Sequence, residues 1–206
     1  MATELKFCGM RREADILAAN ACLPDYIGFV FAAGARRAVT PETARELRAK
    51  ADPRILAVGV FADQSPAYIA DAAAKVPLDV IQLHGSESET VVEEIRRRTG
   101  KPVWRAFQVT APAVLTTAAE TGADGILLDS GKGSGKTFAW EWLRYFSRPY
   151  MLAGGLDTEN VGEAIKTLSP RGVDVSSALE TDGKKDPEKM RAFAEAVRRA
   201  DSETER

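Results

Sequence analysis

The sequence predicts an α/β fold, a single-domain (β/α)8 TIM barrel, because short aliphatic runs alternate with amphipathic helical patterns eight times along 206 residues. Strands separated by helices at intervals of about 25 residues form right-handed βαβ units. Eight such units favour a closed barrel, which is compact beside the ~250 residues typical of this fold. An open, doubly wound sheet is the alternative that the same pattern allows.

The individual elements follow from these patterns in chain order. Aliphatic or β-branched runs predict strands at residues 4–8, 25–31, 55–61, 79–83, 102–107, 124–129, 149–153 and 172–175. Helical spacing of apolar residues predicts helices at 12–22, 41–51, 65–75, 86–98, 111–121, 140–146, 158–168 and 187–199. Thr40-Pro41, Ser65-Pro66 and Asp186-Pro187 each join a capping side chain to a proline at a helix start. The barrel domain spans residues 1–200, and residues 201–206 are expected to form a frayed polar tail.

Composition and charge narrow the classes of function. The chain has 45% hydrophobic and 28% charged residues and a net charge of −2, which gives no reason to expect nucleic acid or an anionic membrane as a partner. The two cysteines lie in separate elements, which predicts no disulfide and favours a reducing cytoplasm. No basic-then-apolar stretch precedes Leu5, so a leader is not expected, and no apolar run reaches the ~18–20 residues that a membrane span needs. The sequence leaves open whether the protein is a monomer or a homodimer.

Cys8 and Asp129 are the principal catalytic candidates. Each ends a predicted strand and is followed by a loop that contains glycine. Catalytic residues of (β/α)8 barrels lie at these carboxyl ends of the strands. A thiol and a carboxyl at such positions can serve as base and acid. Strand parity puts Lys6 on the face of Cys8, and a lysine inside a barrel needs a partner, for which Asp174 on the adjacent last strand is the natural candidate. Positive charge beside Cys8 predicts a lowered thiol pKa. The alternatives are a buried, inert Cys8 and an Asp129 that caps a turn.

Two loops near the end of the chain predict a site for a phosphorylated small molecule. Gly154 and Gly155 follow the seventh predicted strand, and Ser176 and Ser177 follow the eighth. Glycines let backbone N–H groups approach an anion, and the loops after strands seven and eight of a barrel frequently bind phosphate. The alternative is that the two glycines only make a tight turn. By strand parity, Asp174 and Ser176 point into the barrel mouth.

Further polar side chains lie at strand ends. His84 ends the fourth strand and shares its parity with Gln82, so both can line the mouth, although a rim histidine bonded to neighbouring backbone fits equally well. Because His84 is the only histidine, a histidine-rich metal site is not expected. Arg36 and Arg37 follow the second strand, and an arginine fork can bind a carboxylate through two hydrogen bonds.

Residues 130–137, Ser-Gly-Lys-Gly-Ser-Gly-Lys-Thr, nearly match a nucleotide phosphate loop. That pattern requires a glycine where the chain has Ser130, and the stretch follows the sixth strand instead of opening a sheet. We therefore interpret it as a glycine-rich lid over the barrel mouth. A nucleotide-binding protein that uses these residues is the alternative from a different functional class.

Nine segments, which follow one another in order almost from end to end of the chain, carry a resemblance to a known family. They are Lys6-Phe-Cys-Gly-Met10, Gly28-Phe-Val-Phe31, Val58-Gly-Val-Phe61, Gln82-Leu-His-Gly85, Leu127-Leu-Asp129, Gly133-Ser-Gly-Lys-Thr-Phe138, Leu152-Ala-Gly-Gly-Leu156, Gly172-Val-Asp-Val-Ser-Ser177 and Lys185-Asp-Pro-Glu188. The chain resembles the phosphoribosylanthranilate isomerases of tryptophan biosynthesis. The resemblance implies a barrel without metal or organic cofactor that performs an Amadori rearrangement of N-(5-phosphoribosyl)anthranilate. It implies further that Cys8 is the general base, Asp129 the general acid and Arg37 the contact for the anthranilate carboxylate.

Some positions depart from the family pattern. Ala35-Arg36-Arg37 stands where Ser-Pro-Arg is common, which leaves open which arginine binds the substrate. Ala178 replaces a glycine that often follows the two serines, which matters if this position needs a positive φ. A sister phosphosugar isomerase of histidine biosynthesis, or a dual-substrate enzyme, is the second enzyme considered, but it typically has a carboxylate in place of Cys8. The expected reaction begins with Asp129 protonated and Cys8 ionised.

Overall fold

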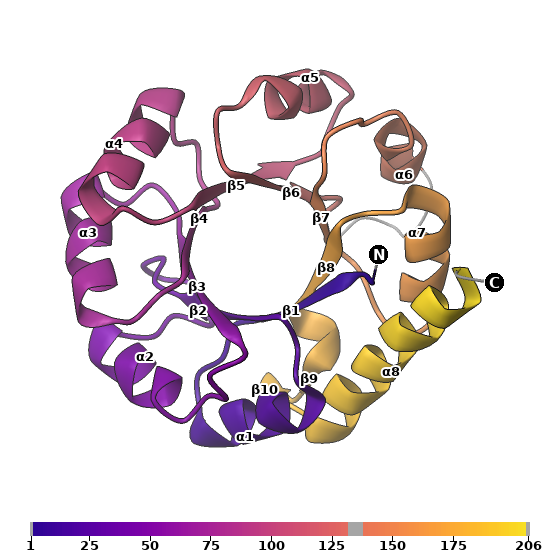
Figure 1. Cartoon of the computed structure of the whole chain (residues 1–206), viewed down its shortest axis with the longest axis horizontal. Coiled ribbons are helices and arrows are strands. Elements are labelled where there is room, and N and C mark those ends of the chain that lie inside the picture. Colours follow the sequence, from indigo (N-terminus) through magenta and orange to yellow (C-terminus); the bar gives the residue numbers. More distant parts are fainter. Residues whose placement is uncertain (1, 132–137, 205–206) are drawn as a thin grey trace.

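The computed structural model describes residues 2–131 and 138–204, and it shows a closed barrel of parallel strands surrounded by helices (Figure 1). The barrel strands are β1 (Glu4–Cys8), β2 (Tyr26–Val30), β3 (Leu56–Phe61), β4 (Val80–Leu83), β5 (Val103–Gln108), β6 (Gly125–Asp129), β7 (Met151–Ala153) and β8 (Gly172–Val175). The helices are α1 (Glu13–Cys22), α2 (Pro41–Arg48), α3 (Pro66–Lys75), α4 (Glu89–Thr99), α5 (Ala113–Glu120), α6 (Phe138–Leu143), α7 (Val161–Leu168) and α8 (Pro187–Thr204). The predicted fold class is confirmed, and because β1 pairs in parallel with both β2 and β8, the open sheet is excluded.

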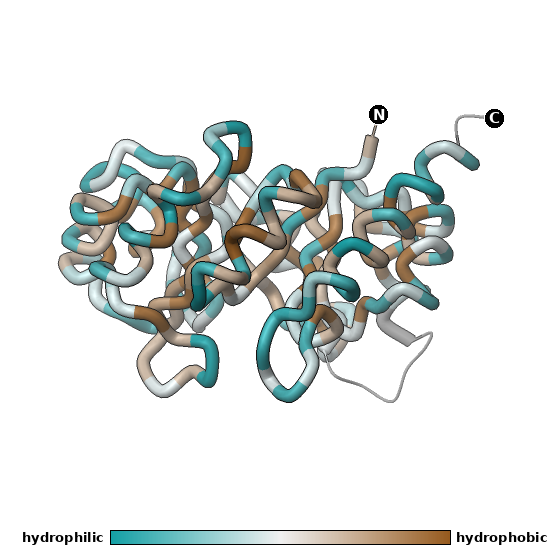
Figure 2. The backbone as a smooth tube through the Cα atoms, turned by 90° about the horizontal axis from the view of Figure 1, so that it is seen from below, coloured by the Kyte–Doolittle hydropathy of each residue, from teal (hydrophilic) through white to brown (hydrophobic). Residues whose placement is uncertain are grey.

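The strand register decides which side chains enter the barrel. Lys6 of β1 lies beside Tyr26 of β2 and Asp174 of β8. The inner cluster of apolar residues contains Tyr26, Val58 and Trp104, whereas Phe7 belongs to the larger core between the strands and the helices. Figure 2 shows hydrophobic and hydrophilic stretches alternating along the tube within the helices, as expected where one face packs on the barrel and the other meets water. The pairing of Lys6 with Asp174 confirms the predicted parity of β1 and β8.

Helix starts follow the capping signals in the sequence. Thr40 and Ser65 each accept a hydrogen bond from a backbone N–H of the first turn of α2 and α3, and Asp186 does so at the start of α8. Ser88 caps α4 in the same way, so this helix begins at Glu89 and not at residue 86 as predicted. A side chain that satisfies an unpaired N–H fixes a helix end more sharply than apolar spacing does.

The end of the chain corrects one expectation. Residues 201–204 continue α8 and are not a frayed tail, while residues 205–206 lie outside the described part. The Asp201 carboxylate accepts hydrogen bonds from the backbone N–H of Thr3 (2.9 Å) and from its hydroxyl (2.6 Å). Lys166 of α7 forms an ion pair with Glu203 at 2.5 Å. These partners come from distant parts of the chain, so a polar composition alone gave no sign of them.

The segment between β8 and α8 contains structure that the hydrophobic pattern did not predict. A short 3-10 helix (Ser177–Leu179) leads into a hairpin of β9 (Glu180–Thr181) and β10 (Lys184–Lys185). Ala178 lies inside the 3-10 helix and is not among the residues with positive φ, so the replacement of glycine causes no backbone strain there. Within the described residues, no helix combines the length and the apolar character needed to cross a membrane.

Candidate active site

A cavity of about 530 Å³ opens at the carboxyl ends of the barrel strands, and we call it the mouth cavity. The predicted site residues that line it are Cys8, Arg37, His84, Asp129, Gly154, Gly155, Asp174, Ser176 and Ser177. Lys6 and Gln82 are fully buried in the barrel and are not among the lining residues. Residues that are far apart in the sequence thus converge on one space, as expected for the carboxyl end of a barrel.

Lys6 and Asp174 form the predicted ion pair inside the barrel. The Lys6 Nζ lies 2.9 Å from the Asp174 Oδ1, and both side chains are buried. Burial lowers the pKa of Lys6, but its contacts with Asp174 and Cys8, of which the negative charge of Asp174 is the strongest, outweigh burial, so the pKa of Lys6 is raised and the ammonium stays charged. The pair places a fixed positive charge beside the Cys8 thiol.

The thiol itself does not follow the prediction. Burial raises the pKa of Cys8 above its usual value, and this effect exceeds the opposing influence of Lys6 and Lys185. Asp174 adds to the rise because its negative charge disfavours a thiolate. The expectation of a lowered thiol pKa is therefore wrong, and Cys8 is a protonated thiol at neutral pH.

The Asp129 carboxylate, at the end of β6, has two hydrogen-bond donors beside it. Its Oδ1 accepts a hydrogen bond from the Gly131 N–H at 2.8 Å, and its Oδ2 lies 3.5 Å from the His84 Nε2. Burial raises the pKa of Asp129, but the hydrogen bonds from His84 and from the Gly131 N–H outweigh burial, so the pKa is lowered. The Gln82 Nε2 lies 3.4 Å from the His84 Nδ1, so a tautomer with hydrogen on Nε2 satisfies both neighbours of the ring. Asp129 is thus a carboxylate before substrate binds.

The two loops expected to bind phosphate both reach the mouth cavity. Gly154 and Gly155 have φ of 88° and 65°, a region that favours glycine. A Cβ on Gly154 would lie 2.4 Å from the Asp129 Oδ1, so a side chain there would collide with the candidate acid. On the other loop, the Ser176 hydroxyl donates to the Cys8 carbonyl at 2.9 Å. The serine loop is therefore fastened directly to the strand that carries Cys8.

Both arginines after β2 bind one carboxylate, that of Glu180. The Arg37 Nε and Nη2 lie 2.5 and 2.9 Å from its two oxygens, and the Arg36 Nη2 lies 2.6 Å from one of them. Arg37 is 20% exposed and Arg36 is 60% exposed, so Arg37 is the deeper of the two. The sequence interpretation missed Glu180 as a site residue, because the two-residue strand β9 leaves no periodic signal.

Of the glycine-rich stretch, only Ser130 and Gly131 can be placed. The Ser130 hydroxyl donates to the Gly154 carbonyl at 2.9 Å, which joins the loop after β6 to the loop after β7. The predicted lid over residues 132–137 lies outside the described residues. Within the described residues, no cluster of histidine, cysteine or carboxylate side chains is arranged to hold a metal ion.

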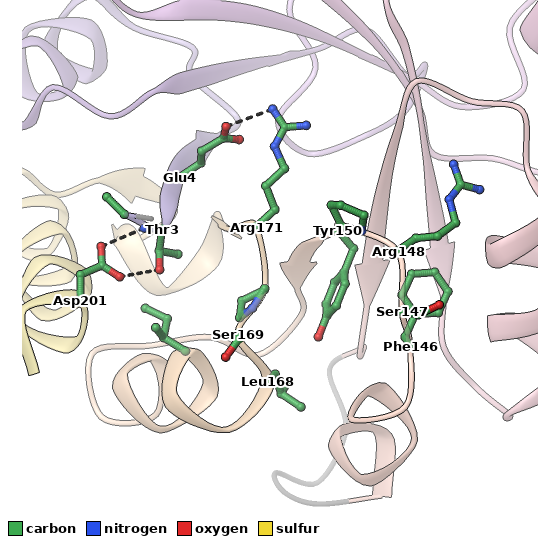
Figure 3. A pocket seen from close by; sticks show the side chains of 14 residues that line it. Thr3, Glu4, Phe146, Ser147, Arg148, Tyr150, Leu168, Ser169, Arg171 and Asp201 are labelled. Atoms are coloured by element: carbon green, nitrogen blue, oxygen red, sulfur yellow. Dashed lines mark hydrogen bonds and ion pairs between the residues drawn. The ribbon is translucent and has the colours of Figure 1, made fainter. Parts of the chain in front are cut away.

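A second pocket, of about 780 Å³, lies at the opposite end of the barrel. Figure 3 shows its lining, with the ion pair of Glu4 and Arg171 and the hydrogen bonds that join Thr3 to Asp201. It surrounds the starts of β1, β7 and β8, whereas the predicted site residues, all of which the structure describes, stand at or near the other end. Although this pocket is larger than the mouth cavity, we therefore do not assign the active site to it.

Comparisons with known proteins identify the family. A family model described as N-(5'phosphoribosyl)anthranilate (PRA) isomerase matches residues 5–196. The chain belongs to this family. The PRA isomerase of Paracoccus denitrificans (strain Pd 1222) is 41% identical over 206 residues, which cover 94% of this chain and 96% of the relative. The solved PRA isomerase of Thermotoga maritima has a TM-score of 0.86 and 35% identity, covering 95% of this chain and 98% of that one.

A further solved PRA isomerase is in complex with reduced 1-(o-carboxyphenylamino)-1-deoxyribulose 5-phosphate. It has a TM-score of 0.84 and 33% identity, and the match covers 95% of this chain and 98% of that one. Membership in the PRA isomerase family confirms the resemblance seen in the sequence motifs. It favours this isomerase over the histidine-pathway isomerase and the nucleotide-binding protein that were also considered.

Proposed function

We propose that this chain converts N-(5'-phosphoribosyl)anthranilate to 1-(2-carboxyphenylamino)-1-deoxyribulose 5-phosphate, with Cys8 as general base and Asp129 as general acid. The observation that carries the proposal is the placement of these two side chains in one cavity, at the ends of β1 and β6. The loops after β7 and β8, which we assign to the substrate phosphate, line the same cavity between them. A fluorescence assay for loss of phosphoribosylanthranilate with the purified protein tests the activity directly.

The reaction consists of proton transfers and the cleavage of the bond between C1 and the ring oxygen. Asp129 donates a proton to the ring oxygen of the ribose, which opens the furanose and leaves a C1 iminium. Cys8 then removes the proton from C2 to form an enolamine, which tautomerises to the ketone. Two positioned side chains supply this chemistry, so the proposal includes no metal or organic cofactor. A cytoplasmic location is part of the proposal and is consistent with the two cysteines, which are both free.

The pKa shifts determine how the rate should depend on pH. Because the pKa of Cys8 is raised and that of Asp129 is lowered, the proton that the pair shares at neutral pH resides mainly on Cys8. The reactive form, a thiolate with a carboxylic acid, is then a minor but constant fraction between the two pKa values. Above the pKa of Cys8 both groups are deprotonated and the acid is lost. We expect kcat/KM to stay level through neutral pH and to fall on the alkaline side only above about 8.5, the ordinary cysteine value.

Alkylation of Cys8 by iodoacetamide, followed by peptide mass analysis to separate it from Cys22, measures the same titration. Its rate should rise over the pH range in which kcat/KM falls. The value of kcat/KM should also fall at low pH, where Asp129 and Cys8 are both protonated. If alkylation rises over that low pH range instead, Cys8 is the group with the lower pKa, and the assignment of the higher pKa to Cys8 is wrong.

The phosphate assignment predicts where an inorganic anion binds. In crystals grown with sulfate, we expect the anion between Gly154-Gly155 and Ser176-Ser177. Backbone N–H groups of a glycine-containing loop can approach an anion closely, and the two loops face one cavity. Sulfate bound only at other places, with this position occupied by water, would count against the assignment.

Arg37→Ala should raise KM by about 10- to 100-fold, the range of a lost charge-assisted hydrogen bond, and change kcat much less. The anthranilate carboxylate keeps its charge throughout the reaction, so a contact with it contributes equally to substrate and transition state. Steady-state kinetics of Arg37→Ala and the more exposed Arg36→Ala compare the two candidates. If Arg36→Ala carries the effect and Arg37→Ala does not, the assignment of Arg37 is wrong.

A further inference from the structure

The hairpin of β9 and β10 brings two charged residues back to the barrel mouth. Its turn contains Asp182 and Gly183, with φ of 50° and 73°, so the chain reverses within two residues. The side chains on either side of the turn, Glu180 and Lys185, are only 6% and 1% exposed. Burial of an ionised group costs free energy unless hydrogen bonds or opposite charges satisfy it. Both residues must therefore be bound to particular partners.

The Glu180 carboxylate has such partners on several sides. It accepts from Arg37 through both of its oxygens, from Arg36 through Oε2, and from the Lys185 Nζ at 3.2 Å. Burial raises the pKa of Glu180, but the hydrogen bonds from Arg37 and the charges of Lys185 and Arg37 lower it to about 2. The carboxylate is consequently ionised at any pH used for an assay of the enzyme.

Glu180 binds Arg37 along one edge of the guanidinium group. A guanidinium is a planar fork with five N–H groups, and it has two edges that can each hold a carboxylate through two hydrogen bonds. Glu180 occupies the edge formed by Nε and Nη2. Among the described residues, the second edge, formed by Nη1 and the other N–H of Nη2, has no hydrogen-bond acceptor, so its donors can bind another carboxylate. Arg37 lines the mouth cavity together with Cys8.

The aliphatic part of the Arg37 side chain, here called its stem, is held in place as well as the guanidinium group. A Cβ on Gly9 would lie only 2.5 Å from the Arg37 Cδ, so the stem lies across the backbone directly after Cys8. Gly9 itself has a φ of 83°, where a glycine is favoured. With the stem on Gly9 and one edge on Glu180, the plane and direction of the guanidinium are both fixed.

Lys185 extends the same network to the other side of the cavity. Its Nζ donates to the Ser176 carbonyl at 2.8 Å and lies 3.3 Å from the Ser176 hydroxyl, which in turn donates to the Cys8 carbonyl. Glu180 therefore links the arginine after β2 to the serine loop after β8, with Cys8 between them.

We propose that Glu180 is a positioning residue, which orients Arg37 so that the second edge of its guanidinium group receives the carboxylate of the substrate. The proposal rests on the proposed function, and in particular on the assignment of Arg37. Orientation before binding removes part of the entropy cost of holding an arginine side chain in one rotamer. Glu180 itself does not touch the reacting atoms.

Glu180→Gln tests the proposal, since the amide keeps the shape but donates where the carboxylate accepts. We expect KM to rise about 10-fold or more, with kcat changed by less than about threefold, because a uniform binding contact is weakened. Glu180→Asp, which keeps the charge on a shorter side chain, should give an intermediate KM. Glu94→Gln is the matched control: it removes a carboxylate paired with Arg98 on α4, outside the mouth cavity, and should leave KM unchanged.

A double-mutant cycle separates positioning from a general structural role. If Glu180 acts through Arg37, Glu180→Gln should change KM by less than about twofold in the Arg37→Ala background, since the two effects are then not additive. An equal rise of KM in both backgrounds would overturn the proposal, and so would a fall of KM in Glu180→Gln, which would mean that Glu180 competes with the substrate. Wild-type turnover combined with a wild-type KM for Glu180→Gln would overturn only this inference. Absence of turnover by the wild-type protein would overturn the proposed function and this inference with it.

Discussion

Cys8→Ser and Asp129→Asn should each lower kcat by about two to four orders of magnitude, the usual contribution of general acid–base catalysis. Serine keeps the shape of the cysteine but scarcely ionises at neutral pH, and asparagine keeps the shape of the aspartate but has no acid proton to donate. Both side chains line the mouth cavity, and because each substitution keeps the side-chain shape, substrate affinity should stay largely intact. Steady-state and single-turnover rates with phosphoribosylanthranilate measure the effect.

The double variant shows whether the two groups act in one reaction. If the acid and the base serve sequential steps, the loss in Cys8→Ser/Asp129→Asn should differ from the product of the two single losses. Cys22→Ser is the matched control, because Cys22 belongs to the core on α1 and is remote from the mouth cavity. Near-native turnover by Cys8→Ser would remove Cys8 as the base and most of the mechanism with it.

The sequence alone predicts the barrel and the convergence of residues from distant parts of the chain at its mouth. Apolar runs with a helix between them require parallel strands, and the carboxyl ends of parallel strands meet at one edge. The parity of β1 and β8 then predicts the pairing of Lys6 with Asp174, because side chains on neighbouring strands that face the same way must meet.

The sequence was insufficient where a property depends on several distant neighbours at once. The pKa of Cys8 was expected to fall because Lys6 lies two residues away, but the outcome depends on burial among other strands and on Asp174 as well. Glu180 was missed for the same reason: its importance comes from Arg37 and Lys185, which reach it from other segments. No single stretch of sequence contains that information.

Lys6→Met should lower the free energy of unfolding by about 3–5 kcal/mol, the usual cost of removing one partner from a buried ion pair. Methionine fills the space of the lysine stem, so the loss comes from the Asp174 carboxylate, which is left buried without its cation. Chemical denaturation with urea measures the change. Lys75→Met, which breaks an exposed pair with Asp71 on α3, is the matched control and should stay close to wild type.

The double variant Lys6→Met/Asp174→Leu decides whether the pair serves stability or the site. Replacing both members of a buried pair by apolar residues of similar size is often neutral or stabilising, so most of the lost free energy of unfolding should return. Activity should not return, because the ammonium beside Cys8 is then still missing and a thiolate at that position becomes harder to form. If the double variant is as unstable as Lys6→Met, the cost lies in packing and not in the uncompensated carboxylate. If it recovers both stability and turnover, the charge of Lys6 has no part in the reaction.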